Sequence, residues 1–342
     1  MRPRLHTVVR TVVAAAVLCL PGVLPAGKYA NAFLEIGVGA RALGMGGAFC
    51  SLADDGTAFY WNPAGLSSIR RLQLSGMYGN QFGSVSNPLG NYHFFGLALP
   101  LAEGAVLAVN WIRLAVDDIP VYSALEGRSY FDRLHDRSLR PSGEPEGMIS
   151  DSEDALFFSF AKSNRLEWDL GWMYHRVRFE IPVGINLKFI RQKLGTGSSS
   201  GLGLDVGSAL RIHLSDLFLS DRFGIMGIGI QLQDVTRTGM DWNTKHEDTV
   251  PMNVKWGVSY TQPLPLEENF LTVSFDRDSR WSGRTHAGLE YIGFRLFQLR
   301  AGLDEGRFTG GAGIRFWILA VDYAFLSHEF NALHRLSCTI AF

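Results

Sequence analysis

Residues 181–189 read IPVGINLKF, and the alternation in this stretch decides the fold class. Every second residue is large and apolar, and the residues between are small, polar or charged. Because successive side chains of a strand point to opposite faces, one face here is apolar and the other is not. The same alternation recurs in 252–261, 271–276 and 319–325. From about residue 70 onward the chain is therefore predicted to be all-β.

Alternation fits two architectures. In a soluble sandwich the apolar face covers a core, whereas in an outer-membrane barrel it faces lipid and the polar face lines the lumen. Strand length favours the barrel, because most of the predicted strands have nine to fifteen residues and soluble strands usually have about 5–6. Fourteen antiparallel strands are predicted, an even number: 70–83, 91–99, 104–115, 154–162, 179–193, 201–212, 223–234, 251–262, 269–277, 284–292, 294–302, 308–316, 317–325 and 333–342.

The connections between these strands also favour a barrel. Connections 116–153 and 235–250 are long and rich in charge, Pro, Gly and Ser, and both are odd-numbered. Even-numbered connections such as 100–103 are mostly tight, as periplasmic turns are. The even connection 163–178 is too long for this rule. It is either an extended pair of strands or a sign that the count is off by one hairpin.

Both ends of the sequence point to the cell outer membrane. Basic residues precede the apolar run 11–20, and residues 1–26 are predicted to be a signal peptide cleaved after Ala26. The last strand alternates and ends on an aromatic residue, which looks like the signal read by the barrel assembly machinery. Membrane lipid and that machinery are therefore the expected partners. The residues of this signal share one face: Leu336, Cys338, Ile340 and Phe342.

Several other classes of function are disfavoured. Beyond the signal peptide no run of about 18 apolar residues could form a membrane helix, and a net charge of −1 does not suggest nucleic acid. Cys50 and Cys338 are expected to be buried small apolar residues, with neither in a metal-ligand spacing. Ser282 and His286 would lie about 13 Å apart on a strand, too far for a nucleophile and its base. No enzyme activity, metal or cofactor is predicted.

A glycine-rich run, IGVGARALGMGGAF (36–49), raises one alternative. Gly37, Gly39 and Ala42 fit the G-x-G-x-x-A spacing of a dinucleotide-binding loop. That loop must follow a buried strand and open a helix inside a βαβ unit. No strand pattern precedes Gly37, and no alternation of strands and helices follows. A nucleotide site is therefore not predicted.

The longer run 32–69 resembles the N-terminus of the PorV/PorQ family of outer-membrane proteins, within the FadL-like group. The matching elements are RALGMGGA (41–48), LADD (52–55) and WNPAGL (61–66), together with parts of 183–190 and 203–207. The resemblance implies a fourteen-stranded barrel (70–342) whose N-terminal segment (27–69) folds into the lumen as a plug.

The plug residues expected to matter combine glycines, charges and a turn. Glycine allows positive φ and close approach of the backbone to inward-facing side chains. The charged residues would need partners once shielded from water, and Asn62-Pro63 should direct the chain from plug to first strand. A purely structural role and a role in gating both remain open. The candidates are Gly37, Gly39, Arg41, Gly44, Gly46, Gly47, Asp54, Asp55, Trp61, Asn62 and Pro63.

Two functions remain after these exclusions. The resemblance to FadL-like barrels implies a plug-gated transport channel for hydrophobic or amphipathic small molecules. The resemblance to PorV and PorQ implies instead a barrel that holds secreted cargo or other components of a type IX-like protein secretion system. In that case the loop 116–153 could serve as a contact surface, rather than being only a solvated loop.

Overall fold

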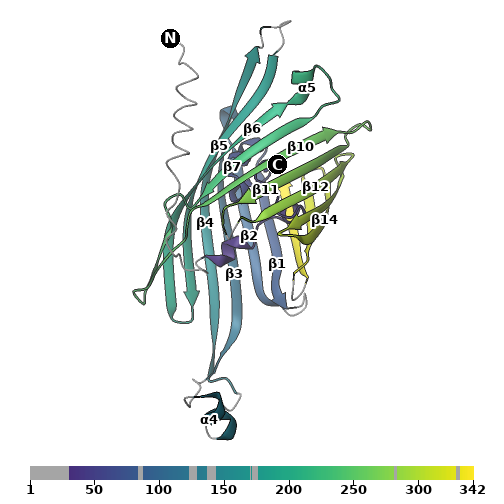
Figure 1. Cartoon of the computed structure of the whole chain (residues 1–342). Coiled ribbons are helices and arrows are strands. Elements are labelled where there is room, and N and C mark those ends of the chain that lie inside the picture. The colour runs from purple at the N-terminus through teal and green to yellow at the C-terminus, as the bar shows by residue number, and fades with distance from the viewer. Residues whose placement is uncertain are drawn as a thin grey trace.

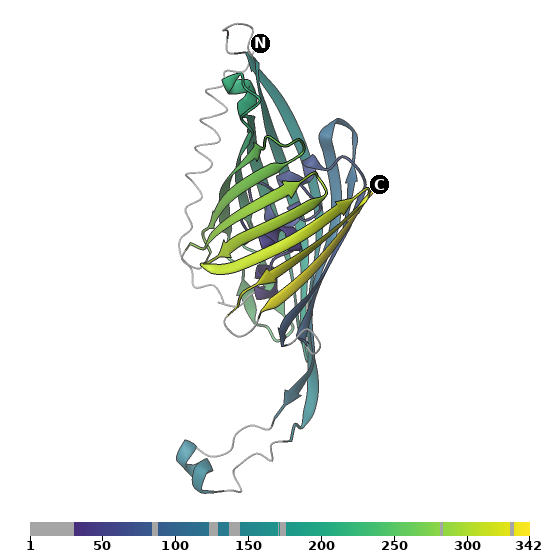
Figure 2. The ribbon, with the colours of Figure 1, turned by 90° about the vertical axis from the view of Figure 1, so that its right-hand side faces the viewer.

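The computed structural model describes residues 31–83, 88–122, 129–136, 144–169, 171, 176–280, 283–328 and 332–342. Fourteen strands form one antiparallel barrel (Figures 1 and 2). They are β1 (Gln73–Gly83), β2 (Pro88–Pro100), β3 (Ala105–Val121), β4 (Gly147–Asp169), β5 (Arg176–Leu194), β6 (Gly197–His213), β7 (Ile225–Gln233), β10 (Asn253–Pro263), β11 (Phe270–Asp278), β12 (Thr285–Gly293), β13 (Phe297–Asp304), β14 (Arg307–Phe316), β15 (Leu319–Leu326) and β16 (Leu333–Ala341).

Each strand pairs with its neighbours in the barrel, and the pairing of β1 with β16 closes the ring. The predicted barrel of fourteen strands is thus confirmed. The signal-peptide prediction (1–26) lies outside the described residues. No helix in the described part of the chain is both long and apolar enough to cross a membrane.

Two of the long connections differ from a plain loop. The segment 163–178 is an extended pair of strands, because β4 continues to Asp169 and β5 already begins at Arg176. The connection 235–250 holds a small hairpin, β8 (Gly239–Trp242) and β9 (Glu247–Thr249). Its strand β8 pairs with β6, but neither strand is part of the closed ring. Four- and three-residue strands in a charged segment carry too little alternation to be recognised in the sequence.

The barrel carries its apolar side chains on the outside. On β5 the side chains of Ile185, Leu187 and Phe189 are 46–48% exposed, whereas Asn186 and Lys188 between them are at most 3% exposed. Polar side chains are buried in the lumen and apolar ones cover the surface, which is the polarity of a membrane barrel and the reverse of a soluble sandwich. Cys338 lies on this outer face and is exposed, so its predicted burial is wrong, while Cys50 is buried.

Residues 31–69, the lumen segment, run through the interior of the barrel (Figure 1). The segment consists of four short helices: η1 (Ala32–Glu35), α2 (Ala40–Gly44), α3 (Ala58–Trp61) and η2 (Pro63–Ser68). The Phe59 ring contacts Phe94 of β2 and Phe157 of β4, with ring centroids 5.5 and 5.0 Å away. The lumen is therefore filled by packed side chains on the side of β2 and β4.

The β3–β4 hairpin reaches well beyond the barrel (Figures 1 and 2). The register of β3 and β4 shifts between Val116 and Ile119, and the pairing resumes at Ile119. Past this bulge the hairpin carries α4 (Tyr130–His135), which starts with a capping box. We call this end of the barrel, with the β3–β4 and β7–β10 connections, the long-loop end. The remaining short helices, η3 (Ala102–Gly104) and α5 (Leu214–Phe218), lie in turns at the opposite end.

Candidate functional site: the interface between the lumen segment and the barrel

Glycines let the lumen segment turn and touch the wall. Gly37, Gly39, Gly46 and Gly47 all have φ between 67° and 90°, a region that side chains disfavour. A Cβ on Gly46 would lie 2.6 Å from the carbonyl oxygen of Leu303 in β13. A Cβ on Gly44 would lie 3.2 Å from the Cα of Gly311 in β14. The segment and the wall thus approach backbone to backbone.

The same glycines do not form a dinucleotide loop. Gly39 precedes α2, which has only five residues, and the preceding described element is the 3₁₀ helix η1 rather than a strand. The backbone N–H of Gly39 donates to the sulfur of Met77 in β1 at 3.2 Å. The βαβ context that a nucleotide needs is absent from the described residues around this run.

Arg41 joins the segment to the barrel. Its guanidinium lies 2.8 Å from Glu290 of β12, 2.5 Å from Asp54 and 3.4 Å from Asp55. Glu290 also accepts from Arg300 of β13 at 2.8 Å. The side chains of Arg41 and Glu290 are 11% and 1% exposed. The partners that the sequence analysis expected for these charges are therefore present, and one of them, Glu290, belongs to the wall.

Arg300 extends this cluster along the wall. It lies 2.7 Å from Asp322 of β15, and its side chain is 1% exposed. Two arginines and four carboxylates are thus connected across the segment, β12, β13 and β15. Because buried charges must be paired, removing one member leaves another uncompensated. The acidic and basic members on the wall stood in predicted strands but were not distinguishable from other polar lumen residues.

Trp61, Asn62 and Pro63 fix the other part of the segment. The indole N–H of Trp61 donates to the carbonyl of Val38 at 2.8 Å. The Asn62 amide donates to the carbonyls of Cys50 (2.9 Å) and Ser208 (3.0 Å), the latter in β6. Asn62 caps η2, and β1 starts only at Gln73, so the Asn-Pro turn leads into a 3₁₀ helix before the first strand.

The wall carries glycines where Asn62 and Pro63 touch it. A Cβ on Gly184 of β5 would lie 2.3 Å from the carbonyl carbon of Pro63. A Cβ on Gly207 of β6 would lie 2.2 Å from the Asn62 side-chain oxygen. These positions were visible in the sequence as glycines on the polar face of a strand, which often mark close approach of another backbone.

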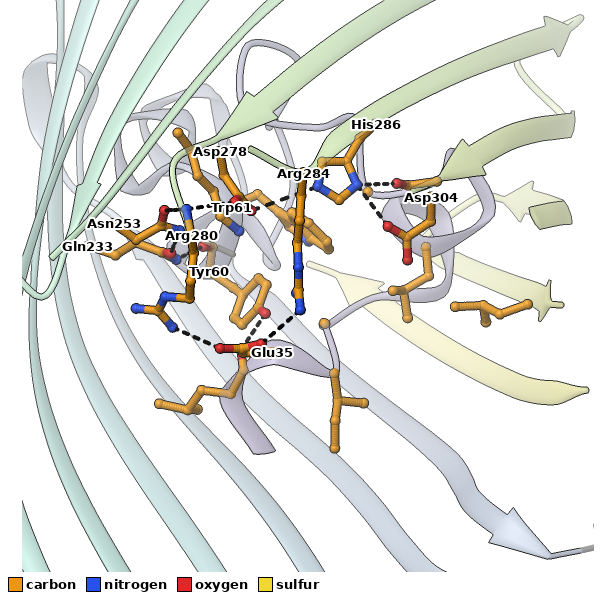
Figure 3. A pocket seen from close by; sticks show the side chains of 18 residues that line it. Glu35, Tyr60, Trp61, Gln233, Asn253, Asp278, Arg280, Arg284, His286 and Asp304 are labelled. Carbon is orange, nitrogen blue, oxygen red and sulfur yellow. Dashed lines mark hydrogen bonds and ion pairs between the residues drawn. The ribbon is translucent and has the colours of Figure 1, made fainter. Parts of the chain in front are cut away.

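A small polar pocket lies beside the segment at the long-loop end (Figure 3). Glu35 of η1 bridges Arg280 (3.3 Å) and Arg284 (3.2 Å) of the β11–β12 connection. His286 lies on the other side of the pocket, 3.0 Å from Asp304. The cavity measures about 60 Å³, enough for a few water molecules and far below the ~300–1,000 Å³ of ligand pockets.

Aromatic rings and a lysine complete this pocket. The ammonium group of Lys255 lies 5.5 Å from the Tyr60 ring and 5.4 Å from the Trp61 ring, both in α3. The Tyr60 hydroxyl donates to the carbonyl of Leu34. Sequence reasoning did not single out Glu35, Lys255, Arg280 or Arg284. Their grouping depends on which strands meet across the lumen, so the only signal was their charge.

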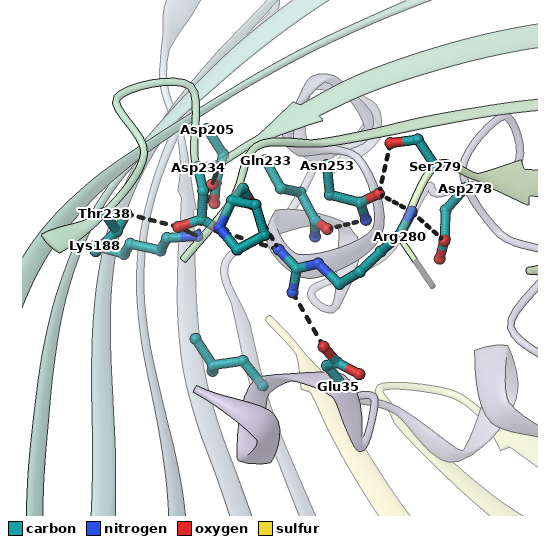
Figure 4. A network of polar contacts seen from close by, with 12 residues as sticks. Glu35, Lys188, Asp205, Gln233, Asp234, Thr238, Asn253, Asp278, Ser279 and Arg280 are labelled. Carbon is teal, nitrogen blue, oxygen red and sulfur yellow. Dashed lines mark hydrogen bonds and ion pairs between the residues drawn. The ribbon is translucent and has the colours of Figure 1, made fainter. Parts of the chain in front are cut away.

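Figure 4 shows a second network of charges, which is connected through Arg280 to the ion pairs of Glu35. Lys188 of β5 lies 2.8 Å from both Asp205 and Asp234. Asp234 in turn lies 3.4 Å from Arg280, which pairs with Glu35. A chain of alternating charges thus leads from the barrel wall to the start of the lumen segment.

Cys50 belongs to the lumen segment and contacts β11. Its backbone N–H donates to the Asp276 carboxylate at 2.6 Å. Burial, reinforced by the nearby Asp276 charge, raises the pKa of the Cys50 thiol. Since the thiolate is the reactive form, burial and the raised pKa both lower the reactivity of this thiol while the segment is in place.

Among the described residues, no group of three or more His, Cys, Asp or Glu side chains has the geometry to hold a metal ion. His286 is engaged with Asp304 and with the carbonyl of Gly46, 2.9 Å away. Ser282, its hypothetical partner, lies outside the described residues.

No protein-family model matches the chain, and no curated protein does either. Solved structures do. The P. putida toluene transporter TodX matches with TM-score 0.50 and 12% identity, over 90% of this chain and 99% of that one. The Ralstonia pickettii toluene transporter TbuX matches with TM-score 0.47 and 11% identity, over 90% and 98%. At 12% identity, the likeness to TodX supports the barrel fold.

Proposed function

We propose that this protein is an outer-membrane channel for hydrophobic or amphipathic small molecules, closed by the lumen segment. The observation that carries the proposal is the lumen itself. Residues 31–69 lie in it, held to the barrel wall by ion pairs and hydrogen bonds such as the Arg41–Glu290 ion pair. A gated barrel requires an apolar outer belt and a segment inside the lumen that can be displaced.

The closed lumen sets a condition on transport. The pocket beside the segment is too small for a hydrocarbon of six or more carbons, so passage by this route requires displacement of part of residues 31–69. Ion pairs and hydrogen bonds at this interface can exchange with water, whereas a packed apolar contact has no such substitute. We therefore place the moving part at the charged side of the segment, around Glu35 and Arg41.

Toluene is a suitable first substrate to test, because TodX and TbuX are described as toluene transporters. We also propose that the chain belongs to the PorV/PorQ family, a proposal supported by the motifs in 32–69.

The test is uptake of labelled toluene and of a labelled fatty acid into liposomes that contain the purified protein. The wild-type protein should transport at least one of them, and a variant lacking residues 31–61 should transport faster and with less selectivity. The matched control lacks the tip of the β3–β4 hairpin. If neither the wild type nor the variant lacking residues 31–61 gave more uptake than protein-free liposomes, the channel proposal would be contradicted.

Cys50 offers a direct readout of segment movement. In a variant whose other cysteines are serine, a membrane-permeant maleimide should leave Cys50 unlabelled in the closed protein, because the thiol is buried and its pKa is raised. Labelling should appear when substrate is added. Substrate transport with Cys50 protected throughout would show that the segment stays in place.

A docking role is the second candidate, and the β3–β4 hairpin favours it. This hairpin extends past the barrel and presents Phe131 of α4, 68% exposed, and Tyr122, 52% exposed. Exposed aromatic side chains at the tip of an arm are typical of protein contacts. Crosslinking in cells from a photoreactive residue at Phe131 should capture a secreted protein if this role holds.

A further inference from the structure

Two adjacent rows of outward-facing residues cross strands β2 to β6. The first row is apolar, and its members are register partners: Phe95, Trp111, Leu156, Phe189 and Leu202. The next row toward the long-loop end is polar: His93, Arg113, Asp154, Arg191 and Ser200. The apolar belt of this wall therefore ends abruptly between the two rows, which is where lipid headgroups meet a barrel.

The polar row carries an excess of positive charge. Asp154 is the single carboxylate in it, and it stands between Arg113 and Arg191 as the register partner of both. Arg113 lies 3.8 Å from Asp154, while the Trp111 indole donates to the same carboxylate at 2.9 Å. One carboxylate shared in this way cannot neutralise two arginines, and Lys193 adds a further exposed cation on β5.

The surface is also hollowed at this place. An open groove of about 620 Å³ lies over β1–β3, and its lining includes Asn91, His93, Phe95, Trp111 and Arg113, together with one carboxylate, that of Asp117. The Arg113 guanidinium lies 6.0 Å from the Trp111 ring. Aromatic rings beside hydrogen-bonding side chains suit a sugar ring, and arginine suits phosphate because its planar fork can donate two hydrogen bonds.

We propose that this groove and the adjoining polar row bind the phosphorylated sugar headgroup of a membrane glycolipid, with its acyl chains lying on the apolar row. Arg113 and Arg191 stand on strands two apart, roughly 10 Å from each other at the usual strand spacing. Each can hold one phosphate of a headgroup that carries two. A phosphoglycerol lipid has one phosphate and would engage only one of them.

The experiment measures binding of defined lipids to the detergent-purified protein by native mass spectrometry. The probes are lipid A with two phosphates, the same glycolipid without phosphates, and phosphatidylglycerol. The test variant is Arg113→Gln/Arg191→Gln. The matched control is Arg165→Gln/Arg176→Gln, which removes two exposed arginines from β4 and β5 at the other end of the wall.

We expect diphosphorylated lipid A to bind the wild type and the control alike, and at least tenfold more weakly to the test variant. Arg113→Lys/Arg191→Lys should retain part of the binding, because charge remains while the two-pronged geometry is lost. Retention of a heat-modifiable band establishes that each variant is folded. Equal binding of the phosphate-free glycolipid or phosphatidylglycerol, or unchanged binding to the Gln variant, would overturn the proposal.

Discussion

Gly46 shows how little room the lumen leaves around the segment. Its φ is +67°, and a Cβ would meet the backbone N, C and O of Leu303 at 2.6–2.8 Å. The neighbouring wall position Gly302 faces it just as closely. At this contact neither the lumen segment nor the barrel wall can carry a side chain unless the two move apart.

Gly46→Val is therefore expected to destabilise the closed protein by at least about 1–3 kcal/mol, the usual cost of overpacking, with backbone strain added. The urea midpoint of the folded band should fall, and residues 31–69 should become sensitive to protease. Gly147→Val is the matched control, because a Cβ there has no neighbour within 4 Å. Equal midpoints for the two variants would contradict the close approach.

Arg41 is the residue through which segment and wall share charge. Arg41→Met leaves Glu290 with Arg300 alone and should loosen the segment at a cost of about 3 kcal/mol. Hydrogen exchange of amides in 31–69 should accelerate more than tenfold. The control Arg295→Met removes an exposed pair, whose side chains are 68% and 53% exposed, and should change exchange little.

A double-mutant cycle separates the pair from its surroundings. Adding Glu290→Gln to Arg41→Met should cost less than the sum of the two single changes, because the uncompensated carboxylate is then gone. Strict additivity would mean that the two side chains do not interact.

Among the elements, the β3–β4 hairpin is the most independent of the barrel. Past Val116 and Asp151, β3 and β4 pair only with each other, whereas β4 begins to pair with β5 at Asp151. Val116 and Asp151 are register partners, so a two-residue turn can join them.

Replacing residues 117–150 by Asn-Gly should leave a barrel that inserts into membranes and stays heat-modifiable, because no ring pairing is lost. Under the channel proposal, uptake is also kept. Loss of folding would show that the hairpin stabilises the ring. Loss of secretion in cells with intact uptake would instead favour the docking role.

At the scale of the molecule, the belt and the lumen divide the side chains of each strand. Leu187 is 46% exposed on the outer face, and Lys188 beside it is 3% exposed and paired with two aspartates. In a membrane the first arrangement is favourable and the second removes charges from contact with lipid.

Leu187→Arg should therefore destabilise the barrel by about 2–4 kcal/mol, the cost of an arginine near the bilayer midplane. Leu194→Arg, at the end of the same strand and 48% exposed, should cost at most about 1 kcal/mol. Unfolding in phospholipid vesicles gives both values. Similar costs for both variants would place the belt elsewhere.

The sequence by itself predicted the barrel strands and the division of each strand into two faces, although it left the count open at 163–178 and took the strand ends 116–121 and 147–153 for part of a loop. This follows from local physics, since alternation with period two is written into consecutive residues such as 181–189. The glycines of 37–47 likewise predicted tight backbone contacts, but they did not indicate which strands would be contacted. The hairpin β8–β9 was not predicted, because strands of three or four residues are too short to show an alternation of apolar and polar residues.

Only the tertiary structure decided which charges meet across the lumen. Arg41 and Glu290 are 249 positions apart, and Glu35 and Arg280 are 245 apart. Such pairs arise only when the ring closes around the segment and sets the register of every strand. Closure is a property of the whole chain, because moving one strand by a single residue would turn its lumen-facing side chains toward the lipid.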